Sequence, residues 1–383
     1  MDMLGGLTAS EFLRDYWQKK PLVIRQAFPG FQCPVSPDEL AGLACEEAVE
    51  SRIVIENDAG KPWQLHNGPF NPDRFSDLPE QDWTLLVQGL DHWVPEIADL
   101  LDNFRFVPNW RLDDIMASYA PKGGSVGPHY DMYDVFLLQA QGHRRWTFGG
   151  HCDHASPRVE GTPLRILSSW DGEETVTLAP GDMLYLPPGI GHHGVAEDDC
   201  ITLSVGFRAP TIDDILTSFT DFLSQKEKAA EHLDDPDLQV QDNPGTIGAE
   251  VIDRLDTVIR EQLGDRRNLA LWFGQFTTAP KSMDIVVPAE EPAEAEDLAE
   301  AIRAGEQLRW NEGSRFAYHE LAGETALFVD GEQYLLKGDA QLLAPVLCAG
   351  ARIDMSALAE FAGDEALLGL LTNLYNQGSL YFE

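Results

Sequence analysis

The sequence predicts a mainly β N-terminal part, either a barrel or a double-sheet jelly roll, followed by helices and a small α+β domain. Between residues 51 and 207, short apolar or alternating runs are separated by turn signals, which is typical of barrels and jelly rolls. After residue 211, apolar residues recur every three or four positions, as in amphipathic helices. A chain of 383 residues with 43% hydrophobic residues can bury more than one core, so we expect two or three domains.

The first element is predicted at residues 10–28, "SEFLRDYWQKKPLVIRQAF". Ser10 is a candidate N-cap for a short amphipathic helix, and the apolar residues after Pro21 suggest a strand. The strands of the predicted barrel follow as short runs. They lie at residues 52–58, 83–90, 134–140, 144–150, 174–189 and 200–207.

Two amphipathic helices are predicted after the strands, at residues 211–233 and 248–263. The apolar stripe of the first comprises Ile212, Ile215, Leu216, Phe219, Phe222 and Leu223. Such stripes need a covering surface, which is either the barrel or a second copy of the chain. Residues 288–301 are acidic with two prolines, and we expect a linker or the start of a solvated helix. The remaining segment mixes helix and hairpin signals, with Asp330-Gly331 as a turn.

Composition narrows the functional classes. There are 64 acidic and 27 basic residues, a formal net charge of −37, which disfavours direct binding to nucleic acid and favours a basic partner. Salt adaptation is the alternative explanation of this charge. No run approaches the roughly 18 apolar residues of a membrane span. The first residues lack the pattern of a signal peptide, and the five cysteines are scattered, so we expect a cytoplasmic protein.

The stretch "VGPHYDMYDVFLLQAQGHRRW", residues 126–146, carries the strongest chemical signal. His129 and Asp131 are two residues apart, so on an extended chain they point the same way. Two histidines and one carboxylate on one side of a metal form the facial triad of non-haem Fe(II) oxygenases. The third ligand would be His192 or His193, and periodicity does not choose between them because the preceding "PPGIG" breaks the strand phase.

The stretches "GPHYDMYDVFLLQAQGHRRW" and "PGDMLYLPPGIGHHGVAEDDCITLSVGFRAP" resemble the JmjC-type 2-oxoglutarate oxygenases. The resemblance is closest to the ribosomal-oxygenase branch, whose bacterial members hydroxylate an arginine of a large-subunit ribosomal protein. It implies a double-stranded β-helix (a cupin-like jelly roll) over residues 1–210, a helical dimerisation region over residues 211–275 and a winged-helix domain over residues 276–383. It also implies Fe(II), with 2-oxoglutarate and O2 as cosubstrates, a basic ribosomal protein as substrate, and a homodimer.

The same resemblance assigns individual residues. His129, Asp131 and His192 match the metal ligands, since the family's distal histidine follows "PPGxx" and precedes "xG". Arg144 matches the basic residue that binds the distal carboxylate of 2-oxoglutarate, for which an arginine's planar fork is well suited. Ser204 and Tyr119 fall in segments that line the cosubstrate pocket.

Two other functions stay open at this point. The first is a JmjC oxygenase acting on another protein residue, as a histidine hydroxylase or a lysine demethylase. The second is a catalytically silent interaction module. The motif "HCDH" at residues 151–154 is too crowded in one loop for the usual zinc spacing.

Overall fold

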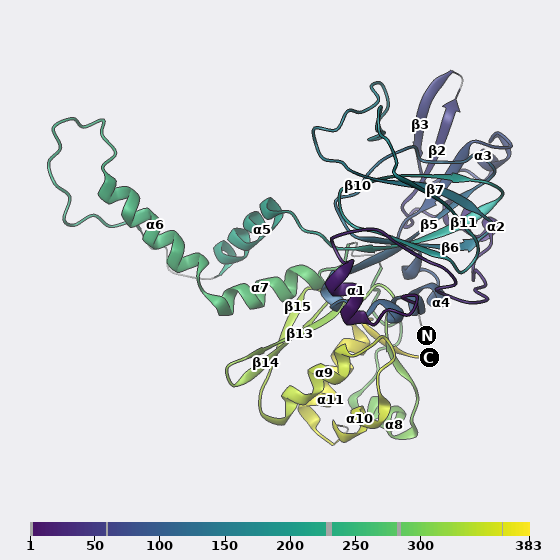
Figure 1. Ribbon diagram of the computed structural model, residues 1–383. Coiled ribbons are helices and arrows are strands. Elements are labelled where there is room, and N and C mark those ends of the chain that lie inside the picture. Colours follow the sequence, from purple (N-terminus) through teal and green to yellow (C-terminus); the bar gives the residue numbers. More distant parts are fainter. Residues whose placement is uncertain (1–2, 59, 227–231, 282–284, 362) are drawn as a thin grey trace.

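Two antiparallel sheets form the N-terminal part of the protein (Figure 1). The computed structural model describes residues 3–58, 60–226, 232–281, 285–361 and 363–383. The larger sheet has the order β1-β9-β6-β11-β5-β4-β2-β3, and the smaller has the order β10-β7-β8. Their strands are β1 (Leu22–Ile24), β2 (Ser51–Asp58), β3 (Lys61–Asn67), β4 (Trp83–Val87), β5 (Leu112–Ala120), β6 (Val135–Gln141), β7 (Arg144–His151), β8 (Glu174–Leu178), β9 (Met183–Leu186), β10 (Ile190–Ala196) and β11 (Cys200–Phe207).

The nearly continuous apolar run of β6 is explained by burial on both faces of the larger sheet. Val135 and Leu137 face a core shared with Trp146 of the smaller sheet. Phe136 and Leu138 point the other way, as alternation requires, into the main core beneath the N-terminal helices. These helices are α1 (Ala9–Asp15), α2 (Pro37–Leu43), α3 (Asp73–Ser76), α4 (Pro95–Ala98) and the 3-10 turns η1 (Leu90–His92), η2 (Asp99–Phe104) and η3 (Asn109–Arg111). The predicted jelly roll is therefore confirmed.

The start of α1 differs from the prediction. Its N-cap is Thr8, not Ser10, because Thr8 and Glu11 form a reciprocal capping box. Ser10 has the wrong spacing for that pairing and lies inside the helix.

Beyond β11 the chain forms α5 (Ile212–Gln225), α6 (Ala249–Leu263) and α7 (Arg266–Thr278). We call α5 and α6 the arm, because Figure 1 shows them projecting away from the sheets. The helix predicted over residues 211–233 ends at Gln225, and residues 227–231 of that prediction lie outside the described residues. Within the stripe of α5, Phe219 is buried against Trp272 of α7, with ring centroids 5.2 Å apart.

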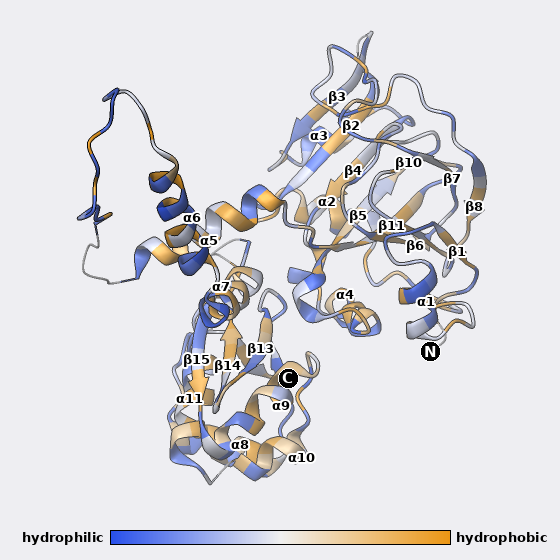
Figure 2. Ribbon diagram, turned by 60° about the vertical axis from the view of Figure 1, so that its left-hand side comes forward, coloured by the Kyte–Doolittle hydropathy of each residue, from blue (hydrophilic) through white to orange (hydrophobic). Residues whose placement is uncertain are grey.

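The C-terminal part has a separate core. It joins buried residues such as Leu298, Leu327 and Leu371. Asp330 and Gly331, both at positive φ, make the predicted turn between β14 and β15. Figure 2 shows apolar residues on the packed strands and helices of this part. Its elements are α8 (Ala295–Ala304), β12 (Leu308–Trp310), β13 (Phe316–Leu321), β14 (Glu324–Val329), β15 (Glu332–Leu336), η4 (Gly338–Leu342), α9 (Leu343–Cys348), α10 (Met355–Leu358), η5 (Ala359–Phe361), α11 (Glu365–Asn376) and β16 (Leu380–Phe382).

Among the residues described, no helix combines the length and apolar character that crossing a membrane requires.

Candidate active site

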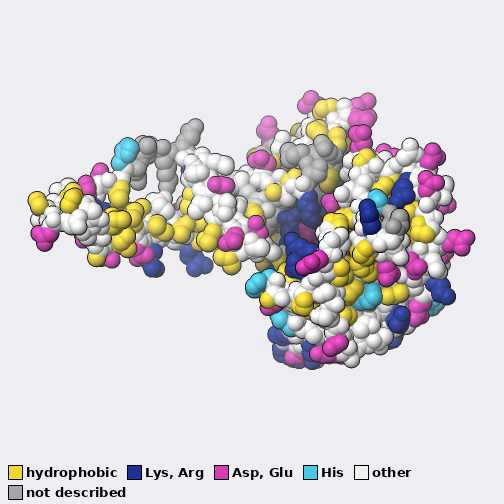
Figure 3. All heavy atoms as spheres, turned by 90° about the horizontal axis from the view of Figure 1, so that it is seen from above, with side chains coloured by type: hydrophobic (Ala, Val, Ile, Leu, Met, Phe, Trp, Pro, Cys, Tyr) yellow, Lys and Arg dark blue, Asp and Glu magenta, His cyan; other side chains and the backbone are white. Residues whose placement is uncertain are grey.

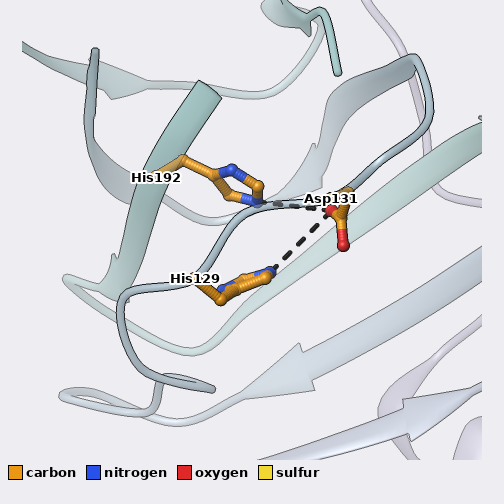
Figure 4. Close-up of side chains that lie close together, drawn as sticks. All are labelled: His129, Asp131 and His192. Carbon is orange, nitrogen blue, oxygen red and sulfur yellow. Dashed lines mark ion pairs between the residues drawn. The ribbon is translucent and has the colours of Figure 1, made fainter. Parts of the chain in front are cut away.

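Three side chains that can bind a metal meet between the two sheets of the jelly roll, which we call the sandwich. The ligand atoms of His129, Asp131 and His192 all lie within 4.8 Å of one another. The Nε2 atoms of His192 and His129 are 3.6 Å and 4.0 Å from the same oxygen, Oδ2 of Asp131. Figure 4 shows both rings directed towards that carboxylate. Two imidazole nitrogens and one carboxylate form a donor set that fits Fe(II) and leaves other coordination positions open.

Backbone hydrogen bonds bring these three residues together. The segment of His129 and Asp131 precedes β6, whereas His192 lies on β10. His129 and His192 exchange both backbone hydrogen bonds, with N to O distances of 2.9 Å and 2.8 Å. The Gly189 N–H donates to the carbonyl of Asp131 at 2.7 Å. The two segments are therefore fixed to one another by the main chain.

Hydrogen bonds also set the tautomers of the two histidines. The Nδ1 of His129 lies 2.9 Å from the Gly127 carbonyl, and the Nδ1 of His192 lies 3.0 Å from the Ile190 carbonyl. Because a carbonyl only accepts, each Nδ1 carries the proton and each Nε2 presents a lone pair to the shared site. Burial, reinforced by the positive charge that His129 can carry, lowers the pKa of His192 to about 4. His192 is therefore neutral near pH 7, as a metal ligand must be.

The structure separates His192 from its neighbour. His193 pairs with Thr147 of β7 and is not part of the group of three. Gly194 follows, and a Cβ there would lie 2.7 Å from the ring of Trp146. That close approach requires glycine and accounts for the "HxG" spacing beside the site.

A cavity of about 560 Å³ opens beside the three residues. Arg144 lines it and is 97% buried, since only 3% of the residue is exposed. Its Nη1 donates to the Ser118 hydroxyl at 3.2 Å, but Nε and Nη2 have no hydrogen-bond partner among the described residues. Arg145 is half-exposed, 3.6 Å from Glu197. A buried guanidinium with two unpaired nitrogen atoms fits a carboxylate ligand.

The two remaining predicted pocket residues lie in different places. Ser204, on β11, lines the cavity. Tyr119 is not among the residues that line it, and its ring packs against Trp83 at 5.6 Å. Because neighbours on β5 point to opposite faces, Ser118 occupies the cavity wall in its place. Sequence reasoning missed Ser118, although the one-residue alternation within "MASYA" was a signal that could have found it.

Comparison with known proteins agrees with this architecture. Residues 99–215 match the model of the JmjC domain, and residues 260–381 match that of the ROXA-like winged helix. The chain is 34% identical to the ribosomal protein uL16 3-hydroxylase of Escherichia coli over 97% of both chains. It is 45% identical to a probable ribosomal oxygenase of Haemophilus influenzae, over 55% of this chain and 52% of that one.

A solved structure is equally similar. The Escherichia coli ribosomal oxygenase YcfD, in complex with cobalt and 2-oxoglutarate, superposes with a TM-score of 0.88 at 33% identity and covers 99% of each chain. Both the jelly roll and the C-terminal unit are included in that match. The chain therefore belongs to the ribosomal-oxygenase family of JmjC-domain proteins.

Proposed function

We propose that this protein is an Fe(II)- and 2-oxoglutarate-dependent hydroxylase that modifies an arginine side chain of a large-subunit ribosomal protein, and that uL16 is that protein. The observation that carries the proposal is that a metal-binding donor set and a buried cation share one cavity. The donor set is His129, Asp131 and His192, and the cation is the guanidinium of Arg144, whose Nε and Nη2 have no hydrogen-bond partner among the described residues. A metal and a carboxylate-bearing cosubstrate account for both.

Each side chain has a role in this proposal. His129, Asp131 and His192 would hold the metal, and Arg144 would bind the distal carboxylate of 2-oxoglutarate with Ser118 beside it. Ser204 would form part of the same wall. Iron held by these residues would supply the chemistry of O2 activation, in which one oxygen atom goes into a C–H bond and the other into succinate as 2-oxoglutarate loses CO2. The protein would hold the target C–H bond near the metal and keep water out.

An acidic wall supports a cationic substrate side chain. Asp113 and Asp114 line the same cavity, and Asp114 is only 4% exposed. An entering guanidinium would meet a partly desolvated carboxylate there, a pairing stronger than a surface ion pair. The uL16 hydroxylase of Escherichia coli, which this chain matches over 97% of its length, points to the same substrate class.

The proposal extends to the partners. A homodimer formed through the arm is supported by exposed apolar residues on it, including Leu216 at 50% and Ile252 at 54% exposure. Figure 3 shows hydrophobic side chains gathered along the arm. The division of the chain at residues 210/211 and 275/276 belongs to this proposal too. A ribosomal-protein substrate suits a cytoplasmic location, and a net charge of −37 disfavours direct contact with nucleic acid.

The decisive experiment is a mass measurement. Purified protein, Fe(II) and 2-oxoglutarate are incubated with ribosomal proteins, and intact masses are compared with those from a reaction without 2-oxoglutarate. We expect one large-subunit protein to gain the mass of one oxygen atom, on an arginine. A gain on histidine, or a loss of methyl groups from lysine, would identify the alternative JmjC activity. Absence of both a modified protein and succinate would favour a silent interaction module.

A further inference from the structure

The C-terminal half of the chain reaches the wall of the catalytic cavity. Lys281, which follows α7, places its Nζ 2.8 Å from Oδ2 of Asp113 and 3.4 Å from Oδ2 of Asp114. Both aspartates lie at the start of β5 and line the cavity, whereas Lys281 approaches from outside and does not line it. A residue remote in the sequence is therefore in contact with the acidic wall.

The two aspartates differ in how many of their oxygen atoms are engaged. Both oxygens of Asp113 are paired, because Arg208 Nε lies 3.2 Å from Oδ1 and Lys281 binds Oδ2. In Asp114, Gln88 donates to Oδ2 at 2.6 Å and Lys281 approaches the same atom. Its Oδ1 makes no hydrogen bond within the part of the chain that is described, and it lies towards Gly206, another residue of the cavity wall. One carboxylate oxygen thus stays available on the cavity side.

A second residue holds the backbone of this wall. Arg315, just before β13, donates from Nη2 to the Asp113 carbonyl at 2.5 Å and lies 3.7 Å from the buried Asp91. Asp91 in turn accepts from the N–H of Ile115 on β5. Asp330 fixes Arg315 within the C-terminal part by accepting from its backbone N–H at 2.8 Å. The start of β5 is thereby attached to the C-terminal core.

We propose that Lys281 is a positioning residue for the reaction: by holding Oδ2 of Asp114, it leaves Oδ1 directed to the cationic side chain of the substrate. Arg315 holds the start of β5, which carries both aspartates, in place. The inference rests on the proposed function and gives the C-terminal part a role in substrate recognition. In the alternative role, Lys281 competes with the substrate for the carboxylates. The two roles make opposite predictions, because removal of a competing lysine would tighten substrate binding.

The test compares Lys281→Met with Lys281→Arg, using a synthetic peptide that spans the modified residue and carries either arginine or citrulline there. Lys337→Met is the matched control, since Lys337 is 75% exposed and pairs with Glu324, and neither residue lines the cavity. Lys281 is 43% exposed, so Lys281→Met should fold, which thermal unfolding checks. We expect Lys281→Met to raise KM for the arginine peptide roughly fivefold, as suits a partly exposed ion pair.

The remaining parameters separate positioning from general damage. For Lys281→Met, kcat and the KM for 2-oxoglutarate should stay near wild type. Lys281→Arg should return the KM for the arginine peptide most of the way to wild type. The KM for the weaker citrulline peptide should be the same with and without the Lys281→Met substitution. An unchanged or lowered KM for the arginine peptide would overturn the positioning role, as would an equal increase for citrulline. If the wild-type protein hydroxylates no ribosomal protein, the proposed function fails and this inference fails with it. If it does so and Lys281→Met behaves like wild type, only the inference fails.

Discussion

The interior of the sandwich and the arm each contain side chains in an environment that does not suit them, and the two mismatches are opposite in kind. In the sandwich, Arg144 is a buried charged group, and two of its nitrogen atoms have no hydrogen-bond partner within the described part of the chain. On the arm, Leu216 and Ile252 are apolar groups exposed to water, and no residue of α6 is buried. A buried charge needs an anionic ligand, whereas an exposed apolar face needs another apolar surface. The chemistry of each group therefore matches the partner that we propose for it: a small carboxylate in the sandwich and a second polypeptide on the arm.

The largest effect should come from the metal group. His192→Ala removes one of the three metal ligands that we propose, and we expect turnover of 2-oxoglutarate to fall at least about a hundredfold, because even outer-shell changes at metal sites cost 10–100-fold. His193→Ala is the control on the neighbouring position and should retain much of the activity. Succinate formation and Fe(II) affinity are the two measurements. If His193→Ala were the more damaging change, the assignment of the ligand would be wrong.

The second test addresses the buried charge directly. Arg144→Ala should raise the KM for 2-oxoglutarate roughly a hundredfold, since the role that we propose for Arg144 is a buried, charge-assisted double hydrogen bond to the cosubstrate. Arg145→Ala should have little effect, because Arg145 is half-exposed and contacts Glu197. Binding of 2-oxoglutarate to the metal-loaded protein, measured calorimetrically, reports the same difference without turnover. If Arg144→Ala and Arg145→Ala weakened 2-oxoglutarate binding equally, the buried charge would not be the group that binds the cosubstrate.

The sequence could predict those parts of the molecule that depend on local spacing. His129, Asp131 and Arg144 are identified by short motifs, and the jelly roll by its strand periodicity. Periodicity could not choose between His192 and His193, and the resemblance to the family selected His192. The choice escapes periodicity because it depends on the backbone pairing of His192 with His129, which is a long-range contact. The contact of Lys281 with the acidic wall was missed for the same reason, because Lys281 and Asp113 are far apart in the sequence.

The arm shows a different limit of sequence reasoning. Periodicity puts Phe219 and Leu216 on one stripe, but α7 covers Phe219 and leaves Leu216 exposed. An apolar stripe on a helix predicts that this face of the helix will be covered, but it does not predict which element will cover it. The structure was needed to divide the stripe into a part buried within the chain and a part available to a partner.

The third prediction uses that division. Leu216→Asp combined with Ile252→Asp should convert a dimer into monomers, because fully burying each aliphatic side chain contributes about 1.5–3 kcal/mol. Thr257→Asp adds a single such charge on the opposite face of α6 and should leave the dimer intact. Light scattering gives the mass, and succinate formation should change little in either variant. A monomeric wild-type protein would show that the apolar face of the arm is not a self-association surface.

The smallest expected effect concerns charge outside both regions. A net charge of −37 should attract a free, basic ribosomal protein and repel assembled ribosomes, which expose rRNA phosphates. Salt screens charges separated by more than about 8 Å at physiological ionic strength, so we expect kcat/KM on the free protein to fall severalfold as salt rises. Thermal unfolding over the same salt series is the control, since a salt-adapted protein would become more stable and mask the trend. A kcat/KM that does not change with salt while stability is constant would contradict electrostatic steering. Modification of intact large subunits as fast as the free protein would contradict it too. In either case the acidity would have to be explained by something other than substrate capture.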